Sequence, residues 1–231
     1  MERKVRHYLI AIKYLVLLAV VFYPLTAPAA NTAGTVTYLN GPLLDRKADG
    51  SIKTLARDSA VEKGDTLITG KRTYARIKFL DSGEMTLRPD SQFKVDSFSY
   101  DQAKPKEDKA AFELVKGGLR AITGQVGKRG DSDSYKMKVP SGTIGIRGTT
   151  FEVRICEGDC PGLADGVYIF VIEGSITITN NAGFLMVNAG QYAYAKNMDS
   201  PPVILPDHPG IEFGLPDYIQ EKTSSEGCIV R

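Results

Sequence analysis

The stretch VPSGTIGIRGTTFEVRI, residues 139–155, decides how the rest of this sequence is interpreted. Two runs of β-forming residues, 143–146 and 150–155, flank a kink at residues 147–149. After the kink, apolar side chains at 151, 153 and 155 alternate with polar ones at 150, 152 and 154, a pattern typical of a strand with one buried face. Pro140 ends the preceding run, because proline donates no hydrogen bond to a sheet.

Three glycines in this stretch, Gly142, Gly145 and Gly148, are spaced three residues apart. The spacing is too close for a helix and predicts tight turns or a close approach of two backbones. Arg147 lies inside the kink, where its guanidinium could bind a carboxylate ligand bidentately. Alternatively, Arg147 pairs with an acid of the same chain or caps backbone carbonyls at a bend that defines the fold.

The segment PSGTIGIRGTTFEV resembles the hallmark segment of FecR-type domains, and further motifs agree with it. These motifs are GTVT (34–37), VEKGDTLITG (61–70), ARIKFLDSG (75–83), LVKGGLR (114–120) and VIEGSITI (171–178). The resemblance covers about residues 34–195 and implies an all-β domain in the periplasm of a Gram-negative bacterium. It also implies a signature that could form a binding site, made of Gly142, Gly145, Arg147, Gly148, Thr149 and Phe151.

The rest of the chain reads as many short strands separated by turn residues, with no long helix. Glycine-rich turns every 8–12 residues or so predict an all-β fold, either a jelly-roll-like sandwich or a short β-roll or β-helix of antiparallel strands. We expect this domain to span residues 34–196. Five prolines follow between residues 201 and 216, so we expect residues 197–231 to form an extended tail with little structure of its own.

Two local pairings are expected within the domain. Residues 75–79 and 84–87 predict a hairpin across the turn at 81–83, with Arg76 and Lys78 facing solvent. Residues 111–115 and 119–123 are expected to pair across Gly117 and Gly118.

The first 29 residues have the pattern of a cleaved secretory signal peptide. Three basic residues near the start precede an apolar run at 14–22, and small residues at A-x-A spacing follow at 27–29. The alternative is an uncleaved membrane anchor, which needs about 20 apolar residues and is interrupted here by Lys13. We therefore expect export to the periplasm, with membrane contact only if the segment is retained.

Three cysteines remain after the signal segment. In an oxidising compartment Cys156 and Cys160 are expected to form a disulfide; half of a metal site is the alternative, but zinc needs four ligands and no partners are evident. Cys228 is left over as a free thiol or an intermolecular partner.

Several classes of function are disfavoured by composition. His208 is the only histidine outside the signal segment, which speaks against a cupin-type metal centre and a Ser-His-Asp triad, so neither a metal nor a cofactor is expected. The small excess of 29 basic over 27 acidic residues comes from the signal segment, and no basic stripe suggests a nucleic-acid partner.

We therefore expect a non-enzymatic envelope module that acts by binding a protein or a polysaccharide, with strand addition at a free sheet edge as one mode. In the family's namesake, the resembling domain relays a signal from an outer-membrane receptor, and a cytoplasmic segment handles a sigma factor. Only residues 1–13 precede the apolar run here, so direct sigma-factor control is not expected.

One rival is an envelope glycan enzyme with a carboxylate pair about 5–10 Å apart. The other is a structural protein crosslinked through Cys228.

Overall fold

The structure is a computed structural model that describes residues 31–129, 133–211, 213–216 and 219. The expected signal peptide and Cys228 lie outside these residues. All described strands belong to one compact unit, Thr32–Arg231. Its first eight strands are β1 (Thr32–Leu39), β2 (Leu43–Arg46), β3 (Ile52–Leu55), β4 (Ala60–Glu62), β5 (Thr66–Thr69), β6 (Ala75–Phe79), β7 (Glu84–Leu87) and β8 (Gln92–Ser99).

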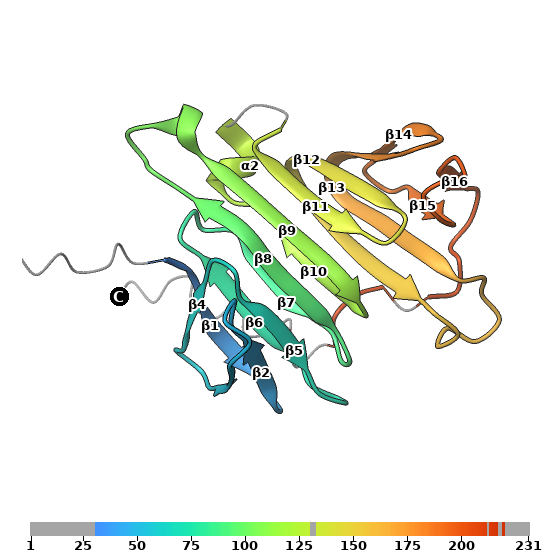
Figure 1. Cartoon of the computed structure of the whole chain (residues 1–231). Helices are drawn as coiled ribbons and strands as arrows, with labels where there is room; N and C mark the ends of the chain where they lie inside the picture. Colours follow the sequence, from blue (N-terminus) through green and yellow to red (C-terminus); the bar gives the residue numbers. More distant parts are fainter. Residues whose placement is uncertain (1–30, 130–132, 212, 217–218, 220–231) are drawn as a thin grey trace, which may run out of the picture. The chain divides into compact units, whose positions relative to one another are not determined.

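The remaining strands include the two longest of the described chain, which form the hallmark segment and its partner (Figure 1). They are β9 (Lys109–Lys116), β10 (Gly118–Ile122), β11 (Tyr135–Val139), β12 (Gly142–Cys156), β13 (Gly166–Asn180), β14 (Gly183–Asn188), β15 (Tyr192–Ala195) and β16 (Val203–Leu205). Two short helices, η2 (Pro105–Glu107) and α2 (Gln125–Arg129), connect strands. The fold is all-β, which confirms the expectation from turn spacing.

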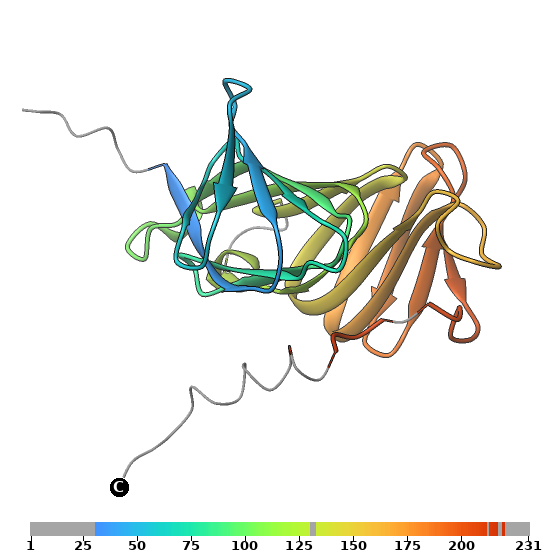
Figure 2. The ribbon, with the colours of Figure 1, turned by 90° about the horizontal axis from the view of Figure 1, so that it is seen from below.

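The strands form one continuous sheet of 16 strands that curls so that its two halves, called here the first and the second sheet, share β12 and β13 and face one another (Figure 2). In the first sheet, the order β3-β2-β5-β8-β9-β11 leads to the first half of β12. In the second, the second half of β12 continues through β10-β7-β6-β1-β4. Strand β13 follows β12 along both halves, and pairs with β14 in the first sheet and with β15 in the second.

Apolar side chains from both sheets fill the space between them. The ring of Phe79 in β6 lies 5.1 Å from that of Phe112 in β9, and Phe112 in turn lies 5.4 Å from Phe93 in β8. Aromatic pairs at these separations contribute about 0.5–1.5 kcal/mol beyond the area they bury. The alternation of apolar residues along the strands is therefore explained by one main core between the sheets, beside a small second cluster that contains Cys156, Tyr168 and Ile211.

One expected pairing is confirmed and the other is wrong. Strands β6 and β7 form the antiparallel hairpin that the turn at 81–83 predicts. Strands β9 and β10 do not pair: β9 lies between β8 and β11, whereas β10 lies between β7 and β12. Gly117, with φ +83°, turns the chain between them. Adjacent strands in the sequence thus belong to opposite sheets. The pair β9–β11 is also parallel, in a fold expected to be antiparallel.

The sheet continues beyond the expected domain boundary at residue 196. Strand β16 pairs with β15, and Ile211, Leu215 and Ile219 beyond it are buried. Arg76, expected to face solvent, is also buried, because this C-terminal part of the chain covers it.

Candidate functional site

The kink in the hallmark segment is the corner at which β12 passes from one sheet to the other. Gly148 has a φ of +64°, a left-handed conformation that costs other residues about 1–2 kcal/mol. Directly beside it, β13 bends at Gly174, with φ +77°. A Cβ on Gly174 would lie 2.7 Å from the carbonyl oxygen of Gly148, so the two glycines form the corner together.

Two other signature residues hold the corner in place. The backbone N–H of Thr149 donates to Thr123 Oγ1 at 2.7 Å, and Thr149 Oγ1 donates to the carbonyl of Ser175 at 2.7 Å. Phe151, two residues further on, is fully buried in the core. Neither Thr149 nor Phe151 is accessible to a ligand.

The two other glycines of the signature have different roles. A Cβ on Gly142 would lie 2.7 Å from the carbonyl oxygen of Thr179, so this glycine permits close contact between β12 and β13. At Gly145 the nearest atom to such a Cβ is the carbonyl oxygen of Thr177, at 3.8 Å. Gly145 therefore leaves space on the outer surface of the sheet.

This space belongs to a groove of about 600 Å³ on the outer face of the first sheet. Across its middle runs one cross-strand row, in which Lys136, Gly145, Thr177 and Met186 lie side by side on β11, β12, β13 and β14. The hydroxyl-bearing residues Thr143, Ser175 and Thr179 line the same groove. Because glycine stands where the other strands have side chains, the row is hollowed at its centre.

Arg147 lines this groove two residues from Gly145 and is exposed. Its guanidinium forms neither a hydrogen bond nor an ion pair with any residue that the structure describes. Lys136, by contrast, has its Nζ 3.0 Å from Asp133 Oδ1. Of the signature residues, the fold thus brings Gly145 and Arg147 together at a surface and uses the other four as framework.

A second groove, of about 340 Å³, lies between the disulfide loop and the C-terminal part of the chain. Arg88, Arg154, Asp90 and Asp159 are among its lining residues. Arg154 Nη2 donates to Asp159 Oδ2 at 2.7 Å, so this acid already has a partner.

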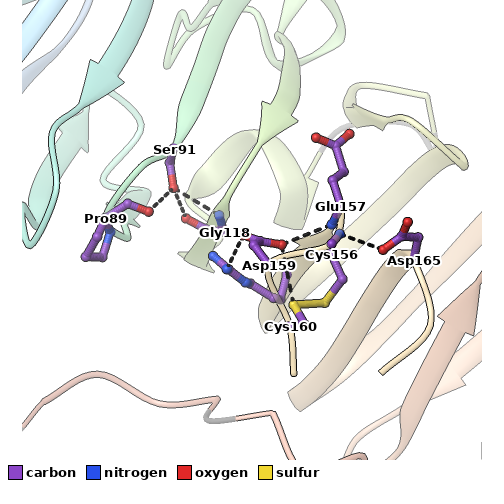
Figure 3. A network of polar contacts seen from close by, with 10 residues as sticks. Pro89, Ser91, Gly118, Cys156, Glu157, Asp159, Cys160 and Asp165 are labelled. Carbon is purple, nitrogen blue, oxygen red and sulfur yellow. Dashed lines mark hydrogen bonds and ion pairs between the residues drawn. A yellow bond between two sulfur atoms is a disulfide. The ribbon is translucent and has the colours of Figure 1, made fainter. Parts of the chain in front are cut away.

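The disulfide between Cys156 and Cys160 forms as expected and closes the loop beside this groove (Figure 3). Within the loop, the backbone N–H of Gly158 donates to Asp165 Oδ1 at 2.7 Å. Figure 3 also shows Ser91 Oγ, which accepts the N–H of Gly118 at 2.9 Å at the start of β10. These contacts fix loops and strand ends.

Buried charges occur away from both grooves. Lys47 Nζ lies 3.0 Å from Asp45 Oδ2, 3.0 Å from Glu62 Oε2 and 2.9 Å from Asp65 Oδ2. Burial raises the pKa of Asp45. Among the described residues, neither of its carboxylate oxygens has a hydrogen bond of good geometry. Burial lowers the pKa of Lys47, but its close contacts with the three carboxylates outweigh this and raise the pKa overall.

Asp81 is the other carboxyl group with a raised pKa among the described residues. Burial raises that pKa against the hydrogen bonds that Asp81 accepts from the N–H groups of Gly83 and Val126. Neither Asp45 nor Asp81 is among the lining residues of these two grooves. The described residues contain no cluster of three metal-ligating side chains and no helix long and apolar enough to span a membrane.

Sequence reasoning missed the residues that surround Gly145 and Arg147. The alternation in SITIT (175–179) could have shown that the serine and threonines face outward, but it could not show which strands lie beside them. Lys136 and Met186 reach the groove only through strand pairing.

The two-sheet β fold with the hallmark segment at its corner defines the class of domain. The family model described as FecR protein matches residues 65–177, which include the corner and Gly145 of the groove. The chain therefore contains a FecR domain.

Solved structures resemble the fold only in part. Two crystal structures of a candidate anti-sigma factor from Parabacteroides distasonis have TM-scores of 0.48 and 0.47 and identities of 9% and 10%. Each alignment covers 61% of this chain and 58% of that protein, so the chain spans little more than half of it. A cell surface anchoring domain has 25% identity over 27% of this chain and 83% of its own, with a TM-score of 0.27. No curated protein matches the chain.

Proposed function

We propose that this FecR-domain chain is a non-enzymatic binding module, exported to the periplasm, that contacts an envelope protein or polysaccharide through the groove around Gly145 and Arg147. The observation that carries the proposal is the hollow at Gly145 beside an exposed arginine that has no partner among the described residues. Both lie within the segment that the FecR model matches.

Arg147 supplies the specific contact in this proposal. A guanidinium offers its N–H donors in a rigid, planar fork that matches a carboxylate or a phosphate. None of the described residues binds this guanidinium, so its donors are available to a ligand that enters the groove. The hollow at Gly145 lets the ligand approach the backbone of the sheet. There the hydroxyl groups of Thr143 and Thr177 offer it further, uncharged hydrogen bonds.

Strand β14 adds a second means of contact. It pairs with β13 along one edge and with no other described strand. Its Phe184 and Met186 are exposed, at 74% and 57%. A free edge with apolar side chains is a surface on which an extended polypeptide can add as a further strand.

An enzymatic reading has less support. A glycosidase needs two carboxyl groups facing one cleft, one of them with a raised pKa. Among the described residues that line the 600 Å³ groove, the only acid is Asp133, which pairs with Lys136. The described carboxyl groups with raised pKa lie elsewhere.

The test is capture of envelope components by the mature chain, with purified sacculi, polysaccharide and envelope protein offered separately. Arg147→Ala removes the guanidinium, and Gly145→Leu fills the hollow without a backbone clash, because 3.8 Å separates the Cβ position from its nearest neighbour. Arg57→Ala, at an exposed arginine outside the groove, is the matched control.

We expect one specific component to be retained by the wild type and by Arg57→Ala, and to be lost from both groove variants. Retention by both groove variants, with thermal unfolding unchanged, would show that binding occurs elsewhere. Capture of nothing by the wild type would contradict the binding-module proposal itself.

A further inference from the structure

The outer face of the second sheet carries one continuous row of polar and aromatic side chains. The row joins paired residues of β6, β7, β10, β12, β13, β15 and β16: Arg76, Thr86, Arg120, Glu152, Phe170, Tyr192 and Leu205. Along the central strands, each of these residues stands between two core residues, so its side chain points away from the core.

Residues 208–211, 213–216 and 219, which we call the C-terminal segment, lie across this row. At the charged end, Arg76 Nη2 donates to the carbonyl of Ile219 at 2.7 Å. Nearer the middle, Arg88 Nη1 donates to the carbonyl of Gly214 at 2.8 Å, and Glu152 accepts the N–H of the same glycine. These charged side chains bind the main chain of the segment, and Glu152 and Arg88 together contact both polar groups of one residue.

At the aromatic end, the contacts are made by rings. Phe170 and Tyr192 stack at 4.4 Å, and Phe213 of the segment lies 5.9 Å from the first ring and 5.8 Å from the second. His208 meets Tyr192 edge-on at 5.1 Å. The surface therefore recognises an aromatic side chain followed by a peptide unit.

The segment lies on the sheet as a ligand would, and does not extend it. It crosses several strands, and Pro209 and Pro216 each remove an N–H that a ladder would need. Gly210 and Gly214 have φ values of +82° and +102°, which are incompatible with a regular strand.

Burying the charged side chains below the segment costs free energy if the segment covers them permanently. Glu152 has a side-chain exposure of 1%, between Arg88 at 13% and Arg120 at 25%. Glu152 Oε1 has an ion-pair distance of 3.7 Å to Arg120 but no hydrogen bond. Well-packed apolar residues stabilise a permanently covered face at least as well as such a cluster. Charged residues have an advantage where the face is at times open to water, since they are then hydrated.

We propose that this row is a binding surface for an extended polypeptide that carries an aromatic–glycine pair, and that the C-terminal segment is its built-in, displaceable occupant. A partner with the same pair enters when the segment leaves: its ring occupies the place of Phe213, and its glycine binds between Arg88 and Glu152. The surface lies on the opposite sheet from the groove at Arg147 and does not depend on the function proposed for that groove.

The experiment uses the full mature chain and a fluorescein-labelled synthetic peptide of residues 206–219. Phe213→Ser weakens the chain's own segment, and Ile52→Ser, which alters an exposed isoleucine of β3, is the matched control. We expect the peptide to bind Phe213→Ser at least tenfold more tightly than the wild type or the control, as measured by fluorescence anisotropy. Adding Arg76→Gln to Phe213→Ser should reverse this gain, whereas a scrambled peptide should not bind.

Amide hydrogen exchange at Gly214 reports whether the segment has left the surface. If exchange accelerates in Phe213→Ser but the peptide does not bind, the surface is no polypeptide site and the proposal is wrong. If exchange is unchanged, Gly214→Pro removes the N–H that Glu152 accepts and forces release. A segment that stays protected in both variants, as measured in Gly214→Pro at the amide of Ile219 because proline has no N–H, is a fixed part of the fold, which also overturns the proposal.

Discussion

The three hallmark glycines allow one chemical change to be tested in three environments. Replacing Gly142, Gly145 or Gly148 with alanine adds the same methyl group each time. The structure nevertheless predicts three different outcomes, because the glycines meet different constraints: a backbone 2.7 Å away at Gly142, open space at Gly145 and a φ of +64° at Gly148.

The magnitudes follow from these constraints. Gly145→Ala should leave the free energy of unfolding unchanged or raise it by up to about 0.4–1 kcal/mol, because alanine restricts the unfolded chain and meets no clash. Gly148→Ala should lower it by about 1–2 kcal/mol, the cost of a left-handed conformation for a residue with a Cβ. Gly142→Ala should lower it by about 1–3 kcal/mol, because β12 and β13 must move apart.

Urea unfolding of the chain without residues 1–29 measures these differences directly. The midpoints of the three variants are compared with that of the wild type, and an unchanged slope shows that the unfolded states are equivalent. If Gly145→Ala loses as much stability as Gly148→Ala, then Gly145 is a framework residue, and the reasoning that assigns it to a surface hollow is refuted.

Three further changes test the charges and the disulfide. Glu152→Ala should destabilise by about 2–3 kcal/mol, less than a fully buried pair because Arg88 and Arg120 reach water. Glu152→Gln removes the charge but keeps an oxygen that can accept the N–H of Gly214, so it should lose less. No loss of stability in Glu152→Gln would argue against a contribution from the charge. Lys47→Met should cost about 3–5 kcal/mol at neutral pH. Because the folded pKa of Lys47 is raised, its contribution is fully present below about pH 10.4 and is lost as the pH rises through the folded pKa. The wild type should therefore lose stability in that range relative to Lys47→Met; parallel pH profiles would contradict this. Replacing both Cys156 and Cys160 with alanine should lower the free energy of unfolding by about 2 kcal/mol, because the unfolded chain regains the entropy that closure of this short loop removes. An unchanged midpoint in urea would show that the disulfide does not stabilise the fold.

Part of this structure could be predicted from local patterns. Alternation along each strand separated the core face from the outer face, and the turn at 81–83 predicted the β6–β7 hairpin. The expected oxidising compartment predicted the disulfide between Cys156 and Cys160, which lie close together in the sequence. Such features depend on residues that are close in sequence, so the chain itself restricts their geometry.

The kink at Arg147, Gly148 and Thr149 was also visible in the sequence, but its role was not. Two short runs flanking a kink proved to be one strand that bends through a corner and serves both sheets. That role depends on Gly174, which lies 26 residues after Gly148 and forms the matching bend in β13.

By itself, then, the sequence determined the fold class, the kink in the hallmark segment and the disulfide loop. Only the tertiary structure decided that β9 and β10 lie in different sheets, that Gly145 opens a groove beside Arg147, and that Arg76 is buried. The physical reason is that periodicity specifies which side of a strand an amino acid occupies, whereas its burial depends on what covers that side. For Arg76 the cover is the carbonyl of Ile219, 143 residues away in the chain.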